Sequence, residues 1–176
     1  MPAKERPAQP HSTANEAAAG VTIAVLDHHD GAVAEQVQHL VALASAQEAS
    51  LLGLAPAEHS AAAVQASPNL HLGARSADGA LLGLLCIGAD DEPNQLAIHT
   101  LVVSPVAQRQ GIATALLQDA LARGPGLAFA VITAAANTPA VALYTRSGFA
   151  VYRHGFMGDG GVPVLKLRRA VPAAAG

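Results

Sequence analysis

A glycine turn set between an apolar run and a helical run constrains the fold of this chain more than any other feature. The turn, Gln108–Ala113, reads QRQGIA, and it lies between the strand-like run Ala97–Val103 and the helical run Thr114–Arg123. The first amides of a helix have no partner inside the helix, and the helix dipole adds partial positive charge there. Gly111 lets the backbone approach a bulky group closely. The sequence therefore predicts a strand–turn–helix junction suited to binding phosphate.

The rest of the chain alternates between short apolar runs and longer runs with helical spacing. We expect strands at residues 21–26, 70–75, 81–89, 96–103, 127–133, 150–157 and 162–167, and helices at 32–54, 57–65, 112–122 and 139–146. The resulting order, β-α-α-β-β-β-α-β-α-β-β, predicts one mixed α/β domain over residues 21–169. Residues 1–20 and 170–176 are rich in small residues and are expected to be a disordered N-terminal tail and a C-terminal tail.

Composition and charge exclude several classes of function. With 10 basic and 13 acidic residues the formal charge is −3, and no basic cluster marks a nucleic-acid partner. No apolar run reaches the ~20 residues that span a bilayer, so no membrane partner is expected. The lone Cys86 cannot form an internal disulfide, which favours a reducing, cytoplasmic setting. The run His28-His29-Asp30 is interpreted as a turn rather than a metal site, and we expect no metal.

A second motif makes the assignment specific. Asn137–Phe149 reads NTPAVALYTRSGF, and together with QRQGIA it resembles the GNAT family, the acetyl-CoA-dependent N-acetyltransferases, in order and in spacing. The resemblance covers about residues 21–169. It implies the GNAT fold, in which the fourth and fifth strands splay apart and the cofactor thioester lies in the resulting V.

The resemblance also implies which residues contact acetyl-CoA. The main chain of the fourth strand would pair with the pantetheine amides as if a strand were added, and the glycine turn would hold the pyrophosphate. A main-chain amide of the same strand could stabilise the tetrahedral oxyanion. The expected contacts are Leu101, Val102, Val103, Arg109, Gln110, Gly111, Ile112, Ala113, Thr114 and Asn137.

Two residues are expected to move protons. Tyr144 matches the family tyrosine that is proposed to protonate the departing thiolate, and a phenol is neutral at pH 7. Some relatives that acetylate protein N-termini carry a glutamate on the fifth strand, where this chain has Ile132. Others carry one on the fourth strand, where this chain has His99, whose imidazole suits a base acting directly or through water. The alternatives are a core role for Tyr144, a helix-capping role for Asn137 and a structural role for His99.

We therefore expect an acyltransferase that moves an acetyl group from acetyl-CoA to a primary amine of a small molecule by direct attack in a ternary complex. The expected acceptor region, residues 28–65 and the hairpin around Gly160, holds Glu35, Glu48 and Glu58 among apolar residues, a mixture suited to an ammonium group. A protein N-terminal or lysine acetyltransferase and a non-catalytic CoA-binding regulatory module are the alternatives. The sequence leaves open the acceptor, the choice between His99 and water as base, the acyl group and whether the chain forms a homodimer.

Overall fold

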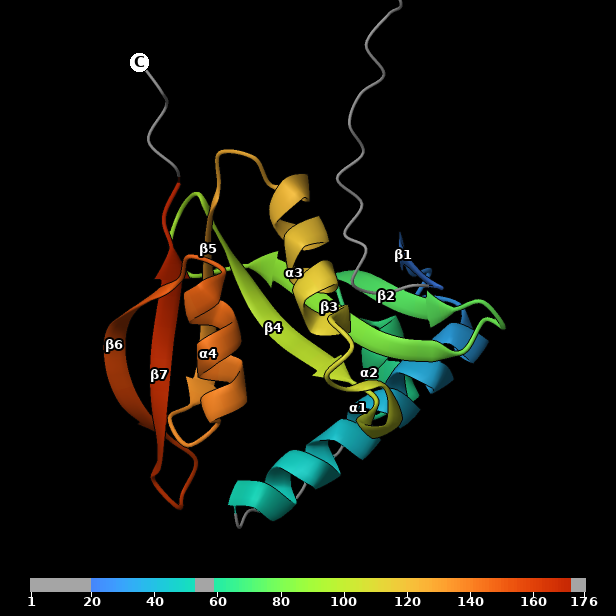
Figure 1. Ribbon diagram of the computed structural model, residues 1–176, viewed down its shortest axis with the longest axis horizontal. Coiled ribbons are helices and arrows are strands. Elements are labelled where there is room, and N and C mark those ends of the chain that lie inside the picture. The colour runs from blue at the N-terminus through green and yellow to red at the C-terminus, as the bar shows by residue number, and fades with distance from the viewer. Residues whose placement is uncertain (1–19, 53–58, 172–176) are drawn as a thin grey trace, which may run out of the picture.

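The structure, a computed structural model, describes residues 20–52 and 59–171 and follows the predicted order of elements (Figure 1). A short 3-10 turn, η1, was not predicted. The predicted tails lie outside the described residues except for residues 20, 170 and 171, and so do residues 53–58, which were expected to end one helix and begin the next. The elements are β1 (Val21–Val25), α1 (Gly31–Leu52), α2 (Ala61–Gln65), β2 (Leu70–Ser76), β3 (Leu81–Ala89), β4 (Gln95–Val103), η1 (Pro105–Ala107), α3 (Ile112–Arg123), β5 (Ala128–Ala134), α4 (Thr138–Arg146), β6 (Ala150–Met157) and β7 (Val162–Arg169).

One seven-stranded sheet in the order β1-β2-β3-β4-β5-β7-β6 organises the molecule. Helices α3 and α4 bury their apolar faces against one side of it, in a core that contains Ile112, Leu116, Phe129 and Tyr144. A second core, around Leu26 and residues 37–41, attaches α1 and α2 to the other side of the sheet. The predicted mixed α/β class is confirmed. No helix in the described part of the chain is both long and apolar enough to cross a membrane.

The parallel pair β4–β5 is short and then opens. The two strands pair only from Gln95 to Ile98 and from Ala128 to Val131. Beyond this point β4 stays paired with β3 as far as Val103, whereas β5 stays paired with β7 as far as Ala134. The strands therefore diverge into a V whose open end points downward in Figure 1. This confirms the predicted splay of the fourth and fifth strands.

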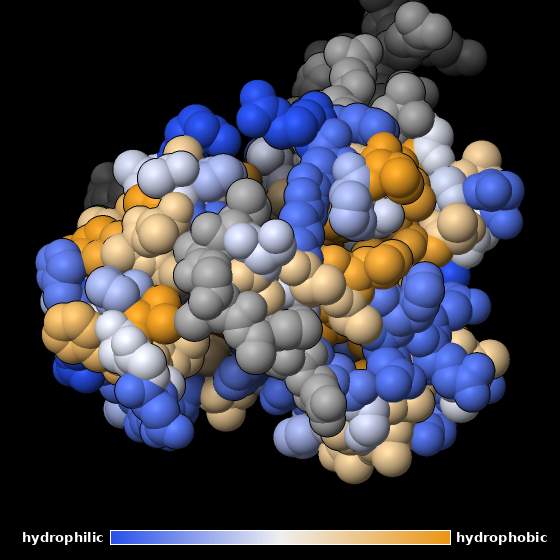
Figure 2. Space-filling view, turned by 90° about the horizontal axis from the view of Figure 1, so that it is seen from below, coloured by the Kyte–Doolittle hydropathy of each residue, from blue (hydrophilic) through white to orange (hydrophobic). Residues whose placement is uncertain are grey.

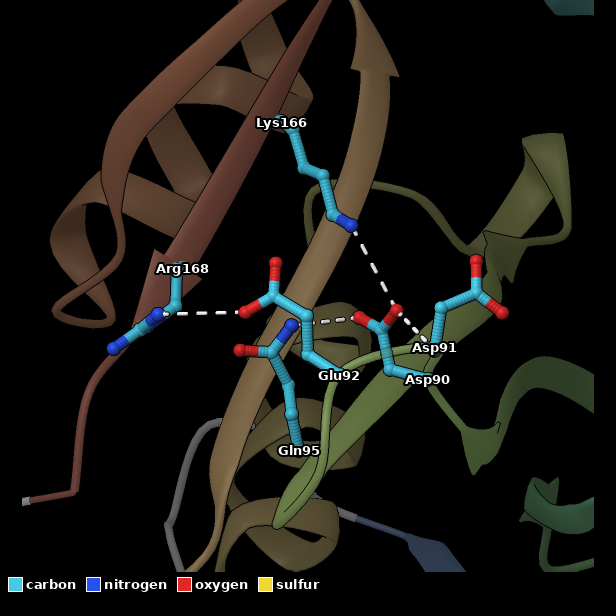
Figure 3. Close-up of polar contacts among 6 residues, drawn as sticks. All are labelled: Asp90, Asp91, Glu92, Gln95, Lys166 and Arg168. Atoms are coloured by element: carbon cyan, nitrogen blue, oxygen red, sulfur yellow. Dashed lines mark hydrogen bonds and ion pairs between the residues drawn. The ribbon is translucent and has the colours of Figure 1, made fainter.

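A polar network closes the other end of the V (Figure 3). In the turn between β3 and β4, Asp90 accepts a hydrogen bond from Gln95 at 2.7 Å, and its carboxylate lies 3.7 Å from Lys166 of β7. Glu92 lies 3.7 Å from Arg168 of the same strand. Burial acts to raise the pKa of Asp90, but the hydrogen bonds it accepts and the charge of Lys166 hold that pKa below its usual value. Because β5 lies between β4 and β7, this turn joins the two halves of the sheet.

A close approach at Gly83 of β3 fixes how α3 lies on the sheet. A Cβ at this position would lie 2.8 Å from Cγ2 of Ile112 and 3.0 Å from Cδ1 of Leu116. Both side chains are fully buried in the first turns of α3. The missing side chain of Gly83 therefore lets the start of α3, and the glycine turn before it, lie directly against β3.

We expect Gly83→Ala to lower the free energy of unfolding by about 1–3 kcal/mol, because the added methyl group overpacks the contact with α3. Urea denaturation measures the effect. Gly160→Ala is the control, since a Cβ at Gly160 meets no atom within 4 Å, and this variant should stay within about 0.5 kcal/mol of the natural protein. Equal urea midpoints for the two variants would show that the close contact between Gly83 and α3 does not limit how α3 packs on the sheet.

Candidate functional site

The edge of β4 that faces the V is not paired with another strand beyond Ile98. Leu101–Val103 pair with β3 on one side, but their β5 side has no sheet partner, since the β4–β5 pairing ends at Ile98 and Val131. Unpaired backbone donors and acceptors on an extended strand can bind a second extended chain with the same pattern of amides. The structure thus places the three predicted residues of β4 along one wall of the V.

The glycine turn presents amides at the end of this wall. Arg109 and Gly111 both adopt left-handed backbone conformations, with φ of 64° and 80°. The first hydrogen bond of α3 runs from the Ala115 amide to the Gly111 carbonyl at 3.0 Å, so the amides of the four residues before Ala115 have no helical partner. A turn of this kind at a helix N-terminus forms a concave site for anions. The side chain of Ile112 is buried, so this residue can contribute only its backbone to that site.

A hollow between α3 and α4 extends from the same place. It is lined by Thr114, Gln118, Leu121, Leu143, Arg146, Ser147 and Arg169. Two of these residues, Arg146 and Arg169, bring positive charge to the lining of this hollow, which begins at Thr114 in the first turn of α3. Sequence reasoning missed both arginines, because one ends an ordinary helix and the other ends a strand, and only the fold brings them near Thr114.

Tyr144 lies in α4 with its ring in the core. It is 5% exposed and packs edge-on against Phe149, with 5.4 Å between the ring centroids. Burial, and then the negative charge of Glu48, raise the pKa of Tyr144 well above its usual value. The phenol therefore remains protonated at physiological pH. The packing role that was weighed for this residue is confirmed.

Asn137, between β5 and α4, connects the β5 arm of the V to α1. Its Oδ1 accepts the Ala140 amide at 3.2 Å, which confirms the capping role that was weighed for it. Its Nδ2 donates to Oε1 of Glu48 at 2.9 Å. This contact joins the start of α4 to the last turns of α1 across 89 positions of sequence.

The end of α1 also contacts the β4 arm of the V. Gln108, in the turn after β4, donates to Gln47 at 2.8 Å and to the Val103 carbonyl at 3.2 Å. Neighbouring residues of α1 therefore contact opposite arms, and the helix passes below the open end of the V (Figure 1). Of the three glutamates expected in the acceptor region, Glu48 alone is shown at this position. Glu35 lies about 20 Å from it along the helix, at 1.5 Å per residue, and Glu58 is outside the described residues.

His99 occupies a bulge where β4 leaves β5. Cys86 and Ile87 of β3 pair with Thr100 and Ile98, so His99 is the extra residue of β4. Its side chain is exposed, and Nε2 lies 3.0 Å from the position that a Cβ on Gly88 would take. The imidazole therefore leans over β3 rather than toward β5. In the described part of the chain no hydrogen bond connects it with Tyr144 or Asn137, so any action on a group in the V would need a bridging water.

The histidines before α1 form a separate, structural cluster. The His28 ring stacks on His71 with 4.1 Å between centroids, and its Nε2 lies 2.9 Å from the Ser67 carbonyl oxygen. Burial is the main cause that lowers the pKa of His71. The described residues hold no group of three or more His, Cys, Asp or Glu side chains suited to a metal ion. The cluster fastens the turn before α1 to the segment after α2.

Comparisons with known proteins agree with this geometry. The model of the Acetyltransferase (GNAT) family matches residues 38–149. The chain is also 34% identical over 131 residues to UPF0157 protein YqkA of Bacillus subtilis (strain 168), a match that covers 72% of this chain. The chain spans 37% of the length of that relative.

Solved structures of low sequence identity share the fold. The ribosomal-protein-S18-alanine N-acetyltransferase of Escherichia coli aligns with a TM-score of 0.69 at 19% identity, over 88% of this chain and 96% of that one. A chimera of the spermidine N-acetyltransferase SpeG from Vibrio cholerae and hSSAT aligns with a TM-score of 0.67 at 17% identity, over 86% and 95%. Because the family model covers more than half of the 176 residues and the splayed sheet agrees with it, the chain belongs to the GNAT acetyltransferase family.

Proposed function

We propose that this protein transfers an acetyl group from acetyl-CoA to a primary amine of a small molecule, by direct attack in a ternary complex. The observation that carries the proposal is the unpaired edge of Leu101–Val103 leading into the anion site at Gly111. A ligand with an extended amide-containing arm followed by a pyrophosphate matches both features at once. Acetyl-CoA has that form.

Each part of the donor site has a role in this proposal. The backbone of Leu101–Val103 pairs with the pantetheine amides, and the amides of residues 109–114 hold the pyrophosphate, with Asn137 on the opposite arm. Arg146 and Arg169 supply positive charge for a further phosphate group. Bound acetyl-CoA supplies a thioester whose carbonyl carbon forms the new C–N bond and whose C–S bond then breaks. An amide of the same β4 edge stabilises the oxyanion formed on the way.

Two side chains balance the protons. Tyr144 donates its hydroxyl proton to the departing sulfur, and its raised pKa keeps that proton in place until the thiolate forms. His99, through a water, takes the proton that the attacking amine loses. A neutral amine loses one proton, and the thiolate gains one. His99 then releases its extra proton to solvent and Tyr144 takes one up, so both side chains return to their starting states.

A small amine fits the acceptor side better than a protein or nucleic acid. Figure 2 shows the molecule from below, and around the atoms drawn in grey apolar and hydrophilic side chains are intermingled. The formal charge of −3 gives polyanions little attraction. Ile132, just beyond the last β4–β5 pair, is 52% exposed where some protein-acetylating relatives carry a glutamate. A protein amine remains the second candidate, since one structural neighbour acetylates a ribosomal protein and another spermidine, by their names.

We expect acetyl-CoA at about 100 times its Kd to stabilise the natural protein by about 2.7 kcal/mol, and Gly111→Val to abolish this stabilisation. A valine at φ 80° is strained, and its side chain occupies space that the phosphates need. Thermal unfolding with and without acetyl-CoA measures the effect.

Gly126→Val is the matched control for strain. Gly126 has a φ of 82°, and a Cβ there meets no atom within 4 Å. Both variants should be less stable than the natural protein, but only Gly111→Val should lose the response to acetyl-CoA. A natural protein whose unfolding temperature is unchanged by acetyl-CoA would remove the basis of the proposed donor site.

Replacing Tyr144 by Phe should slow turnover by about 10²- to 10⁴-fold while acetyl-CoA still binds, because only the proton donor is lost. The ring and its contact with Phe149 remain. Thiol release measures turnover, and thermal stabilisation measures binding. Tyr152→Phe, which alters the other tyrosine on the exposed strand β6, is the control. If Tyr144→Phe works at the natural rate, another group protonates the thiolate.

The acceptor class is tested by thiol release from acetyl-CoA with amino acids, polyamines, aminoglycosides and peptides with free N-termini. We expect turnover with one or more of the small amines, rising toward alkaline pH because the attacking nitrogen must be unprotonated. Turnover of the peptides alone would establish the protein-acetylating alternative. Tight binding of acetyl-CoA with every amine inert would instead favour a regulatory CoA-binding module.

A further inference from the structure

Glu48 places a carboxylate at the open end of the V, where no basic side chain of the described residues forms a salt bridge with it. One of its oxygens accepts from Asn137 at 2.9 Å, and the other takes part in no hydrogen bond within the described part of the chain. The side chain is exposed. A carboxylate that accepts from one neutral donor still has lone pairs that can accept hydrogen bonds from a ligand.

The position of Glu48 is fixed from both sides of the V. Its carboxylate accepts a hydrogen bond from Asn137, which lies between β5 and α4. The neighbouring Gln47 accepts one from Gln108, which follows β4. The carboxylate also lies close enough to Tyr144 for its charge to affect that phenol. A ligand group bound to Glu48 would therefore be at the end of the V where Tyr144 is expected to act.

We infer that Glu48 binds the acceptor as an ammonium ion and so selects for cationic amines. The inference rests on the proposed function. It adds that the acceptor is a cation and that Glu48 is the residue that recognises its charge. A charged hydrogen bond between ammonium and carboxylate is stronger than a neutral one, and it would hold the nitrogen at the V until a proton is removed. Glu48 is a binding residue in this scheme. The bound ammonium first loses one proton to water, and the amine loses a second, through water to His99, as the C–N bond forms. The thiolate takes a proton from Tyr144, so one proton is released to solvent in each turnover.

Glu48→Gln separates this role from a purely structural one. A glutamine keeps an oxygen that can accept the Asn137 amide, so the connection between α1 and α4 remains while the charge is lost. Glu35→Gln is the matched control, because it removes the same charge from the same helix about 20 Å away. Both positions are exposed on α1, and thermal unfolding should show that both variants fold.

The first measurement needs no turnover. Calorimetric titration of n-pentylammonium chloride into the protein alone gives an affinity, and n-pentanol serves as the uncharged probe. We expect Glu48→Gln to weaken pentylammonium binding by about 10- to 100-fold, the usual effect of one hydrogen bond to a charged group. The affinity for pentanol should not change, and Glu35→Gln should behave as the natural protein. Equal pentylammonium affinity in Glu48→Gln and the natural protein would overturn the inference.

Turnover with the best amine of the acceptor panel gives the second measurement. Glu48→Gln should raise the KM for that amine about 10-fold or more and leave the KM for acetyl-CoA unchanged, whereas His99→Ala should lower kcat. Added salt should weaken amine binding in the natural protein more than in Glu48→Gln. An unchanged KM for the amine overturns the role of Glu48 alone. Failure of acetyl-CoA to bind the natural protein overturns the proposed function, which the pentylammonium titration does not depend on.

Discussion

The end of pairing between β4 and β5 is the constraint on which the rest of the site depends. Backbone donors and acceptors inside a protein are almost always paired, because an unpaired buried group costs about as much as a lost hydrogen bond. Beyond Ile98 and Val131 each strand keeps only its outer neighbour. The inner edge of β4 therefore has no strand partner there, although the Val103 carbonyl accepts a hydrogen bond from the Gln108 side chain. The glycine turn that follows adds amides of α3 without helical partners at the same wall.

The two faces of the sheet support this V differently. The core under α3 and α4 is continuous across both arms, since it includes Leu85 of β3 together with Phe129 of β5 and Leu167 of β7. The core under α1 and α2 draws only on the β1–β4 side. The β5–β7–β6 half is thus left open on the α1 face, where Ile132 is exposed. One core therefore packs against both sides of the V, and the other packs against the β1–β4 side alone.

Polar contacts act at both ends of the V. At the closed end, Asp90 and Glu92 reach past β5 to the basic residues of β7, so the arms are joined where the strands still pair (Figure 3). At the open end, Gln47 and Glu48 of α1 touch opposite arms. The second set of contacts is made by exposed side chains, which contribute little to stability but can place charge where a ligand arrives. The closed end therefore joins the two halves of the sheet, and the open end is bridged by exposed side chains of α1.

Local signals in the sequence determined most of the fold. Periodic apolar runs predicted the elements in the observed order, Asn137 before Pro139 predicted a helix cap, and Gly111 between a strand and a helix predicted the turn that opens α3. These features depend on residues close in sequence, because backbone sterics and helix-end amides act over one turn. The splay of β4 and β5 was predicted from the family resemblance, which carries tertiary information that local patterns lack.

Tertiary structure alone decided which distant residues meet. The bulge that turns His99 toward β3 depends on strand register, which a sequence does not display. Arg146 and Arg169 line one hollow with Thr114 only because the fold brings the ends of α4 and β7 beside α3. Three glutamates looked equivalent in the sequence. Of these, Glu48 contacts Asn137, which lies 89 positions later in the chain, because of the length and direction of α1. Contacts of this kind arise from the packing of whole elements against one another, so their residues carry no local mark.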